Sequence, residues 1–206
     1  GLADVTDRLR RHLATAYAIY FNLDNPAASS AFVDVTLARV RDIRFLVQGE
    51  VTKAGSYALH PSLGNLIYAL SAAGGVKETG TLRQIQVRRG GQTLSIDFYD
   101  FILRGTMDPD RLRIRNGDVI FVPVKRKEVT IQGEVRRPGI YALHPRESED
   151  LEVLIEFAGG LQPAASTDRI LLRRTEVNVG LRTLSVNLEA DRAAKRRTEL
   201  MDGDLV

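Results

Sequence analysis

The sequence predicts an α+β protein in which two tandem copies of a small domain follow a helix and a strand. Three observations predict this fold class. Sequence blocks recur in the same order, apolar residues alternate in short runs, and an amphipathic helical segment recurs at a similar place in each copy. The chain has 206 residues, 44% of them hydrophobic, so each copy can bury a core of its own.

The internal repeat defines the domain organisation. Phe45–Val51 returns 84 residues later as Val129–Val135, and Gly55–Pro61 returns at the same offset as Gly139–Pro145. Three shorter blocks keep the order at offsets of 85, 90 and 86: Ala73-Gly74-Gly75 with Ala158-Gly159-Gly160, Thr93-Leu94-Ser95 with Thr183-Leu184-Ser185, and Asn116-Gly117-Asp118 with Asp202-Gly203-Asp204. The change in offset places a five-residue insertion in the second copy between Arg174 and Thr183.

The repeat divides the chain into residues 1–42, residues 43–124 (repeat 1) and residues 125–206 (repeat 2). Val206 aligns with Ile120 of repeat 1, so repeat 2 is expected to be truncated at its C-terminal end. The three basic residues at 125–127 are expected to form an exposed linker between the repeats.

The first segment of the chain predicts an amphipathic helix followed by a loop and a strand. The helix, with Asp4 or Thr6 as a possible cap, has one apolar face made of Val5, Leu9, Leu13, Ala16, Tyr17 and Tyr20. The strand is indicated by the alternation of Val33, Val35 and Leu37. A helix and one strand cannot form a core, so residues 1–42 are expected to be the C-terminal part of a preceding domain.

Each repeat is expected to begin with a strand, a turn and a return strand. Phe45 and Val47 alternate with polar residues, as in a half-buried strand. In repeat 2, Pro138 and Gly139 fit a type II turn in which the glycine adopts a positive φ. The return strand starts at Tyr57 in repeat 1.

A helix follows the first two strands of each repeat. Its spacing of i, i+3, i+4, i+7 is met by Leu63, Leu66, Ile67 and Leu70, and in repeat 2 by Leu151, Leu154, Ile155 and Ala158. The Gly-Gly pair after each helix is typical of helix termination.

The second half of each repeat predicts a hairpin, a short helical turn and a last strand. Ile85 and Val87 form one strand of the hairpin, which turns at Gly90-Gly91 into a second strand. Residues 99–104 are expected to form the helical turn, and residues 119–123 the last strand. Each repeat is therefore expected to be a small curved sheet that holds one helix.

Composition and motifs argue against several function classes. The net charge is only +3, without the clustered cations and stacking aromatics of a nucleic-acid surface. The chain has no cysteine, and its histidines, His12, His60 and His144, lack metal-ligand spacing. No nucleotide-binding or nucleophile-elbow motif occurs. We therefore expect no catalytic residue, metal or cofactor, and no enzyme activity.

The repeated blocks resemble the SLBB domain, a β-grasp-like module whose name denotes a soluble-ligand-binding β-grasp. The resemblance lies in V-x-G-E-V-x-x-P-G-x-Y, then a helix ending in A-G-G, then G-D-x-I-x-V-P, with Ala54 in place of the turn proline in repeat 1. The positions that match this motif, for which a structural role is expected, are Gly49, Glu50, Gly55, Tyr57, Ala73, Gly74, Gly75, Gly117, Asp118, Gly133, Glu134, Pro138, Gly139, Tyr141, Ala158, Gly159, Gly160, Gly203 and Asp204.

Two SLBB copies after a helix and a strand are similar to the polysaccharide export family of Gram-negative outer membranes. This resemblance implies a periplasmic, outer-membrane-associated chain that forms a homo-oligomeric ring, a conduit for capsular polysaccharide or exopolysaccharide. It also implies an inner-membrane polysaccharide co-polymerase or tyrosine kinase as a partner. The alternative is an SLBB ligand- or glycan-binding module with a sensing or scaffold role.

Two sets of polar residues are candidate contacts. Arg88, Arg89, Arg173 and Arg174 recur at the hairpin of each repeat and could line a passage for an acidic polymer or pair with a neighbouring subunit. Gln48, Glu50, Gln132 and Glu134 point away from the apolar face, where they could bind sugar hydroxyls, contact a subunit or be solvated. Tyr57 and Tyr141 are expected to pack at the strand end, with the hydroxyl on a backbone partner.

Overall fold

The structure is a computed structural model that describes residues 2–18, 20, 29–36 and 40–206. It divides into two compact units, residues 1–41 and residues 42–206. Each unit is described here by itself, and the second contains both repeats.

The first unit contains the helix α1, Leu2–Ala16. It starts before the expected caps, so Asp4 lies inside its first turn and acts there by charge rather than as a cap. Residues 31–36 have no regular secondary structure, so the strand expected at Val33 and Val35 is not formed, and Leu37 lies outside the described residues. A single strand forms no ladder hydrogen bonds without a partner strand.

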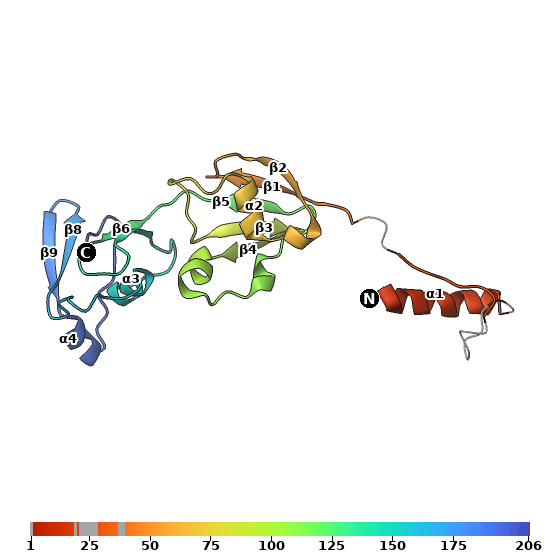
Figure 1. Cartoon of the computed structure of the whole chain (residues 1–206). Helices are drawn as coiled ribbons and strands as arrows, with labels where there is room; N and C mark the ends of the chain where they lie inside the picture. The colour runs from red at the N-terminus through yellow and green to blue at the C-terminus, as the bar shows by residue number, and fades with distance from the viewer. Residues whose placement is uncertain (1, 19, 21–28, 37–39) are drawn as a thin grey trace. The chain divides into compact units, whose positions relative to one another are not determined.

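Repeat 1 is a five-stranded sheet that curves around one helix (Figure 1). The strand order is β2-β1-β5-β3-β4, with β5 parallel to β1 and the other pairs antiparallel. Its elements are β1 (Ile43–Gly49), β2 (Gly55–Leu59), α2 (Leu66–Ala72), β3 (Ile85–Arg89), β4 (Gln92–Ile96) and β5 (Val119–Val122), with short helical turns at Pro61–Leu63, Asp100–Arg104 and Pro109–Leu112. The central strand of this sheet, β5, is the last strand of repeat 1 in sequence order.

The core of repeat 1 lies between the concave face of the sheet and α2. Val47, Val87 and Ile120 occupy neighbouring positions on three adjacent strands, and all three are buried. Leu66 and Leu70 of α2 pack against this row in one cluster. The alternation of apolar and polar residues in these strands therefore has the predicted explanation: every second side chain faces the core.

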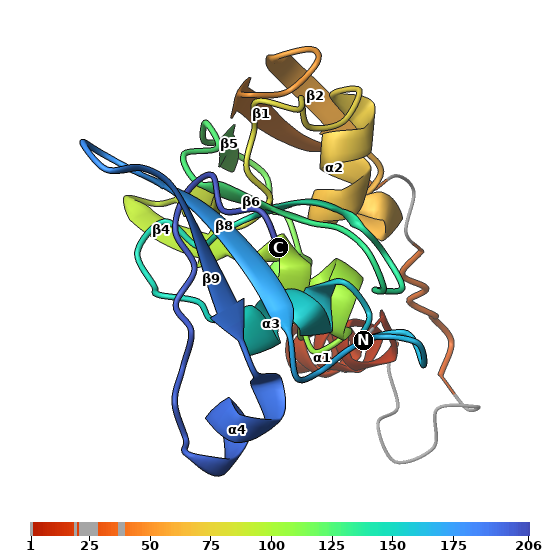
Figure 2. The ribbon, with the colours of Figure 1, turned by 90° about the vertical axis from the view of Figure 1, so that its left-hand side faces the viewer.

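Repeat 2 has the same plan, and its strands form two ladders of one sheet (Figure 2). Leu205 takes the place of β5, with a parallel bridge to Thr130 and an antiparallel bridge to Arg173. The elements are β6 (Glu128–Ile131), β7 (Gly139–Ala142), α3 (Leu151–Phe157), β8 (Ile170–Glu176), β9 (Gly180–Val186) and α4 (Leu188–Ala193). In the described part of the chain no helix is both long and apolar enough to cross a membrane.

The predicted helix register in repeat 1 is wrong by one turn. Leu63 belongs to the preceding 3₁₀ turn, and Ile67 is 37% exposed, whereas Leu66, Ala69 and Leu70 are buried. The helix begins after its N-cap Asn65, whose side chain accepts a hydrogen bond from the Tyr68 N–H. The buried face of α2 therefore includes Ala69, which the predicted register leaves out.

The predicted role of Gly139 is also wrong. Gly139 has no positive φ and begins β7 as extended backbone, as Gly55 begins β2. The positive φ of this motif belongs to Gly49 and Gly133, at +86° and +81°. The Gly-Gly pairs after α2 and α3 do adopt positive φ, as the helix-termination pattern predicts.

Two motif glycines of repeat 1 that share a φ of +86° provide a matched test of close packing. A Cβ on Gly49 would lie 2.1 Å from the carbonyl oxygen of Val122, whereas a Cβ on Gly117 meets no atom within 4 Å. We expect Gly49→Ala to lower the free energy of unfolding by about 3 kcal/mol or more, and Gly117→Ala by about 1–2 kcal/mol from backbone strain alone. Chemical denaturation of both variants measures this, and equal losses would contradict the role of the β5 contact.

Candidate functional site

A buried ion pair joins the hairpin of repeat 1 to the turn that starts β5. The side chain of Asp118 is fully buried and accepts two hydrogen bonds from Arg89, from Nε at 2.8 Å and from Nη2 at 2.6 Å. Its Oδ2 also accepts from the Arg115 N–H at 2.8 Å. The carboxylate is thereby satisfied without water, which a buried charge requires.

The same clamp recurs in repeat 2. Asp204 is fully buried and accepts from Arg174 Nε at 2.9 Å, from Arg174 Nη2 at 2.7 Å and from the Met201 N–H at 2.8 Å. Hydrogen bonding to the aspartate raises the pKa of each arginine. Two of the four hairpin arginines, Arg89 and Arg174, are therefore engaged inside their own repeat, and Arg88 and Arg173 are the two exposed ones.

The convex face of the sheet in repeat 1 presents a row of polar and aromatic side chains. Phe121 on β5 is the register partner of Gln48 on β1 and of Gln86 on β3, and all three side chains point away from the core. The Arg88 guanidinium lies over the Phe121 ring, 5.0 Å from its centroid, and its Nη2 donates to Gln86 Oε1 at 3.0 Å. We term these four residues the convex platform.

The convex platform combines the groups that bind a sugar. A phenyl ring offers an apolar face to sugar C–H groups, and the flanking amides can donate and accept hydrogen bonds with hydroxyls. The counterparts in repeat 2 are Gln132, Leu171 and Arg173, so one of the two amides is replaced there by an aliphatic side chain. Sequence reasoning singled out Gln48 and Arg88 but missed Gln86 and Phe121, although strand alternation places both on the outer face.

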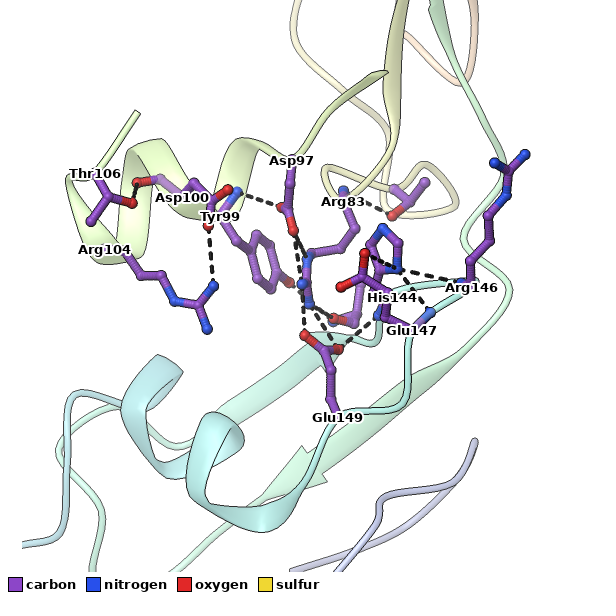
Figure 3. A network of polar contacts seen from close by, with 12 residues as sticks. Arg83, Asp97, Tyr99, Asp100, Arg104, Thr106, His144, Arg146, Glu147 and Glu149 are labelled. Atoms are coloured by element: carbon purple, nitrogen blue, oxygen red, sulfur yellow. Dashed lines mark hydrogen bonds and ion pairs between the residues drawn. The ribbon is translucent and has the colours of Figure 1, made fainter. Parts of the chain in front are cut away.

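A buried arginine connects the two repeats (Figure 3). Arg83 of repeat 1 has a side chain only 3% exposed, between Asp97 of its own repeat and Glu149 of repeat 2. Its Nε donates to Asp97 at 2.9 Å, and its Nη2 donates to Glu149 at 2.7 Å. Its Nη1 donates to the backbone carbonyl of Ala142 at 3.0 Å. One guanidinium thus holds groups from both sides of the junction.

Aromatic rings enclose this guanidinium. The Arg83 Cζ lies 4.6 Å from the ring centroid of Tyr99 and 5.0 Å from that of Phe157, and the two rings meet edge to face. The Tyr99 hydroxyl accepts a hydrogen bond from the Ala142 N–H at 3.0 Å. Burial raises the pKa of Tyr99, so the phenol stays neutral at physiological pH.

A second arginine extends the junction toward solvent. Arg104 pairs with Glu156 of repeat 2 at 3.1 Å and stacks on Phe157 at 4.9 Å. Burial works against the charge of Arg83, but its hydrogen bonds to Glu149 and Asp97 outweigh that effect and raise its pKa. The charges, the aromatic contacts and the backbone bonds together fix the second repeat against the first.

The junction residues are not repeated at the aligned positions of the other repeat. Arg83 aligns with Asp168 of repeat 2, and Tyr99 aligns with Glu189. Phe157 likewise replaces the exposed Ala72 of repeat 1. Conservation between the two repeats does not identify these residues. The signal that could have found them is the opposite one: at these positions the aligned side chains differ in charge and size.

A hollow of about 380 Å³ lies in repeat 2 beside Val206. Its apolar lining includes Ile131, Val135 and Leu161. At the corresponding place in repeat 1 the strand β5 packs into the core, with Val122 buried. We therefore assign no ligand to the hollow.

Other motif residues have local structural roles. The hydroxyls of Tyr57 and Tyr141 donate to the carbonyls of Lys53 and Arg137 at 2.6 and 2.7 Å, the backbone bond that the sequence predicts. His60 Nδ1 accepts from the Ser62 N–H, so this histidine caps a turn. Glu50 accepts a hydrogen bond from the Thr79 hydroxyl, and Glu134 is exposed.

Among the described residues, no group of three or more histidine or acidic side chains is placed to hold a metal ion.

Comparisons with known proteins agree with the repeat. Residues 43–122 and residues 129–181 each match a family model described as an SLBB domain. The chain is 32% identical over 140 residues to the EPS I polysaccharide export outer membrane protein EpsA of Ralstonia solanacearum, covering 66% of this chain and 36% of that protein. It is 30% identical over 108 residues to the polysialic acid transport protein KpsD of Escherichia coli, covering 52% of this chain and 19% of that protein.

The clamp predicts a strong stability effect that depends on its partner. We expect Asp118→Asn to lower the free energy of unfolding by about 2–4 kcal/mol, because Arg89 loses its charge partner and the NH2 group that replaces one carboxylate oxygen cannot accept a hydrogen bond. The double variant Asp118→Asn/Arg89→Met should lose less than the sum of the single variants. Denaturant unfolding of all three tests this, and strict additivity would show that the two side chains do not act as a pair.

The junction predicts loss of a fixed arrangement between the repeats. Arg83→Met leaves the carboxylates of Asp97 and Glu149 without their shared cation, and we expect a loss of about 3–5 kcal/mol in unfolding free energy. The distribution of interatomic distances from small-angle X-ray scattering should broaden, and the rate of proteolysis at residues 124–128 should increase. Arg88→Met, at an exposed arginine, is the control and should leave scattering and proteolysis unchanged. Identical behaviour of both variants would contradict the role of Arg83.

Proposed function

Because the chain belongs to the polysaccharide export proteins that carry tandem SLBB domains, we propose that it forms part of the periplasmic section of an outer-membrane polysaccharide conduit. The chain spans about a third of the length of EpsA and a fifth of that of KpsD. The proposal therefore concerns the part that these two repeats play in the whole protein. That part is passive: the repeats shape a passage and contact the polymer, and no bond in the polymer is made or broken.

The convex platform is the observation that carries polymer contact. Phe121 lies between two amide side chains on adjacent strands, and Arg88 adds a positive charge. A sugar ring that took the place of the Arg88 guanidinium on Phe121 would bring its hydroxyls within reach of Gln48 and Gln86. A long polymer needs many weak contacts of this kind, because a tight site would hold it in place rather than let it pass.

The buried junction supports a conduit built from many copies. A ring requires each copy to present its surfaces at one angle, and heterologous contacts close only if that rotation is constant. Arg83, Glu149 and Phe157 hold the two repeats as one body, which meets this requirement. The proposal therefore includes a homo-oligomeric ring in the complete protein, located in the periplasm at the outer membrane.

The remaining parts of the proposal concern partners. A polymer that enters a periplasmic ring must be delivered from the inner membrane, so an inner-membrane polysaccharide co-polymerase or tyrosine kinase is the proposed partner. Arg173 of repeat 2, exposed at the counterpart of Arg88, is a second candidate for contact with polymer or a neighbouring subunit.

The test is made in the native cell. Gln48→Ala/Arg88→Ala/Phe121→Leu keeps an apolar side chain at 121 but removes the ring, one amide and the cation. We expect surface polymer to fall by about tenfold, since each lost hydrogen bond or stacking contact weakens binding, with polymer retained in the periplasm. Surface polymer is measured by quantitative sugar analysis of cell fractions.

The matched control is Gln132→Ala/Arg173→Ala, at the equivalent positions of repeat 2. Its surface polymer should fall less than that of the platform variant. Protein level and location are measured in each strain. Normal export by a stable, correctly located platform variant would refute polymer contact at this face, and a small-molecule sensing role would then become the stronger explanation.

A further inference from the structure

The hairpin of repeat 2 ends in an exposed apolar tip. Val177, Val179 and Leu181 are 87%, 72% and 70% exposed, and each is more exposed than any other large hydrophobic residue of repeat 2. All three lie in the five-residue insertion between Arg174 and Thr183. The corresponding turn of repeat 1 is Gly90-Gly91, which has no side chains to present. The apolar tip is thus an addition specific to the second repeat.

The tip is held on a stiff arm. β8 and β9 are paired over their full length, from Ile170↔Val186 to Glu176↔Gly180, so two more residue pairs are formed than in β3 and β4 (Figure 2). Asn178 and Gly180 adopt positive φ and close the turn. At its base the arm is tied to the body of the repeat by the Arg174–Asp204 clamp. The aliphatic side chains are therefore presented in a defined place.

Cationic side chains follow the apolar tip along the arm. Arg182 is half exposed and pairs with Glu176 at 3.2 Å, directly below the tip. Arg173 and Arg169 are exposed further down the same ribbon. Aliphatic side chains at a turn, with cations behind them, match the boundary between lipid tails and anionic headgroups.

We propose that the β8–β9 hairpin inserts its apolar tip into the surface of a lipid bilayer that contains anionic lipid. The area favours lipid over a second protein, because three side chains cannot supply the roughly 1,000 Å² that a stable protein interface buries. A bilayer needs no matching pocket, and each aliphatic side chain gains by leaving water. The inference rests on the proposed location at the outer membrane, but it concerns the lipid contact alone.

The experiment uses the full chain and vesicles of phosphatidylethanolamine with phosphatidylglycerol. We expect the chain to float with these vesicles and to bind pure phosphatidylcholine vesicles less. Val177→Ser/Val179→Ser/Leu181→Ser should reduce partitioning into the anionic vesicles by at least about tenfold, because three aliphatic side chains are lost from the contact. Circular dichroism confirms that the variant folds.

The control variant changes three exposed apolar residues outside the tip: Val124→Ser/Ile140→Ser/Met201→Ser. It should float with the vesicles like the unchanged chain. Equal loss in both variants, or no flotation of the folded chain, would overturn the proposal. So would a tip variant that keeps vesicle binding but changes sedimentation velocity, because the tip would then contact a second copy.

The vesicle result separates this inference from the proposed function. The vesicle assay contains no polymer, and the export assay of the platform variant leaves the apolar tip unchanged. The two experiments can therefore fail independently. Loss of export in the platform variant together with no vesicle binding would leave the conduit in place and remove the lipid contact.

Discussion

The fold of each repeat depends on one buried carboxylate at the start of its central strand. β5 comes last in repeat 1, yet it lies between β1 and β3 and pairs with both. The turn that precedes β5 must therefore be held in position for β5 to pair with both neighbouring strands. Asp118 does this by accepting hydrogen bonds from the Arg89 side chain and the Arg115 backbone, while its own carbonyl accepts from the Leu46 N–H. A buried pair of this kind adds little net stability over an apolar one, but removing one partner leaves an uncompensated buried charge and is strongly destabilising.

The duplicated scaffold leaves the outer surfaces of the repeats free to differ. Both clamps and both tyrosine-to-backbone bonds are kept, with distances that agree within 0.1 Å for the arginine Nε and Nη2 contacts. The differences lie in side chains outside the main core of each repeat, such as Arg83 against Asp168 and Ala72 against Phe157. Both repeats contribute side chains to the junction, and repeat 2 has the longer hairpin.

Much of the fold could be predicted because it depends on local periodicity. Alternating residues identified the strands of the two repeats, although the same alternation at Val33 and Val35 predicted a strand that is not formed. The Gly-Gly pairs identified the helix ends and the β3–β4 turn. The register of α2 could not be predicted, since Leu63 and Ile67 satisfy the same i, i+3, i+4 spacing as the buried residues of the helix. Spacing alone does not distinguish the two registers. Arg89 and Asp118 were both recognised as recurring, but their pairing depends on β3 and β5 being neighbours. The Arg83 junction depends on how two finished domains meet, which no local pattern encodes.

The junction and the convex platform place opposite demands on the same side-chain type. Arg83 is surrounded by two carboxylates, a carbonyl and two rings, so its guanidinium is fully paired inside the junction and holds the repeats together. Arg88 lies over one ring and bonds one amide, which leaves most of its donors turned to solvent. A guanidinium that is fully paired gives rigidity, and one that is only positioned keeps hydrogen-bonding capacity for a passing ligand. A polymer conduit needs both, since its walls must keep their shape while each contact with the polymer stays weak.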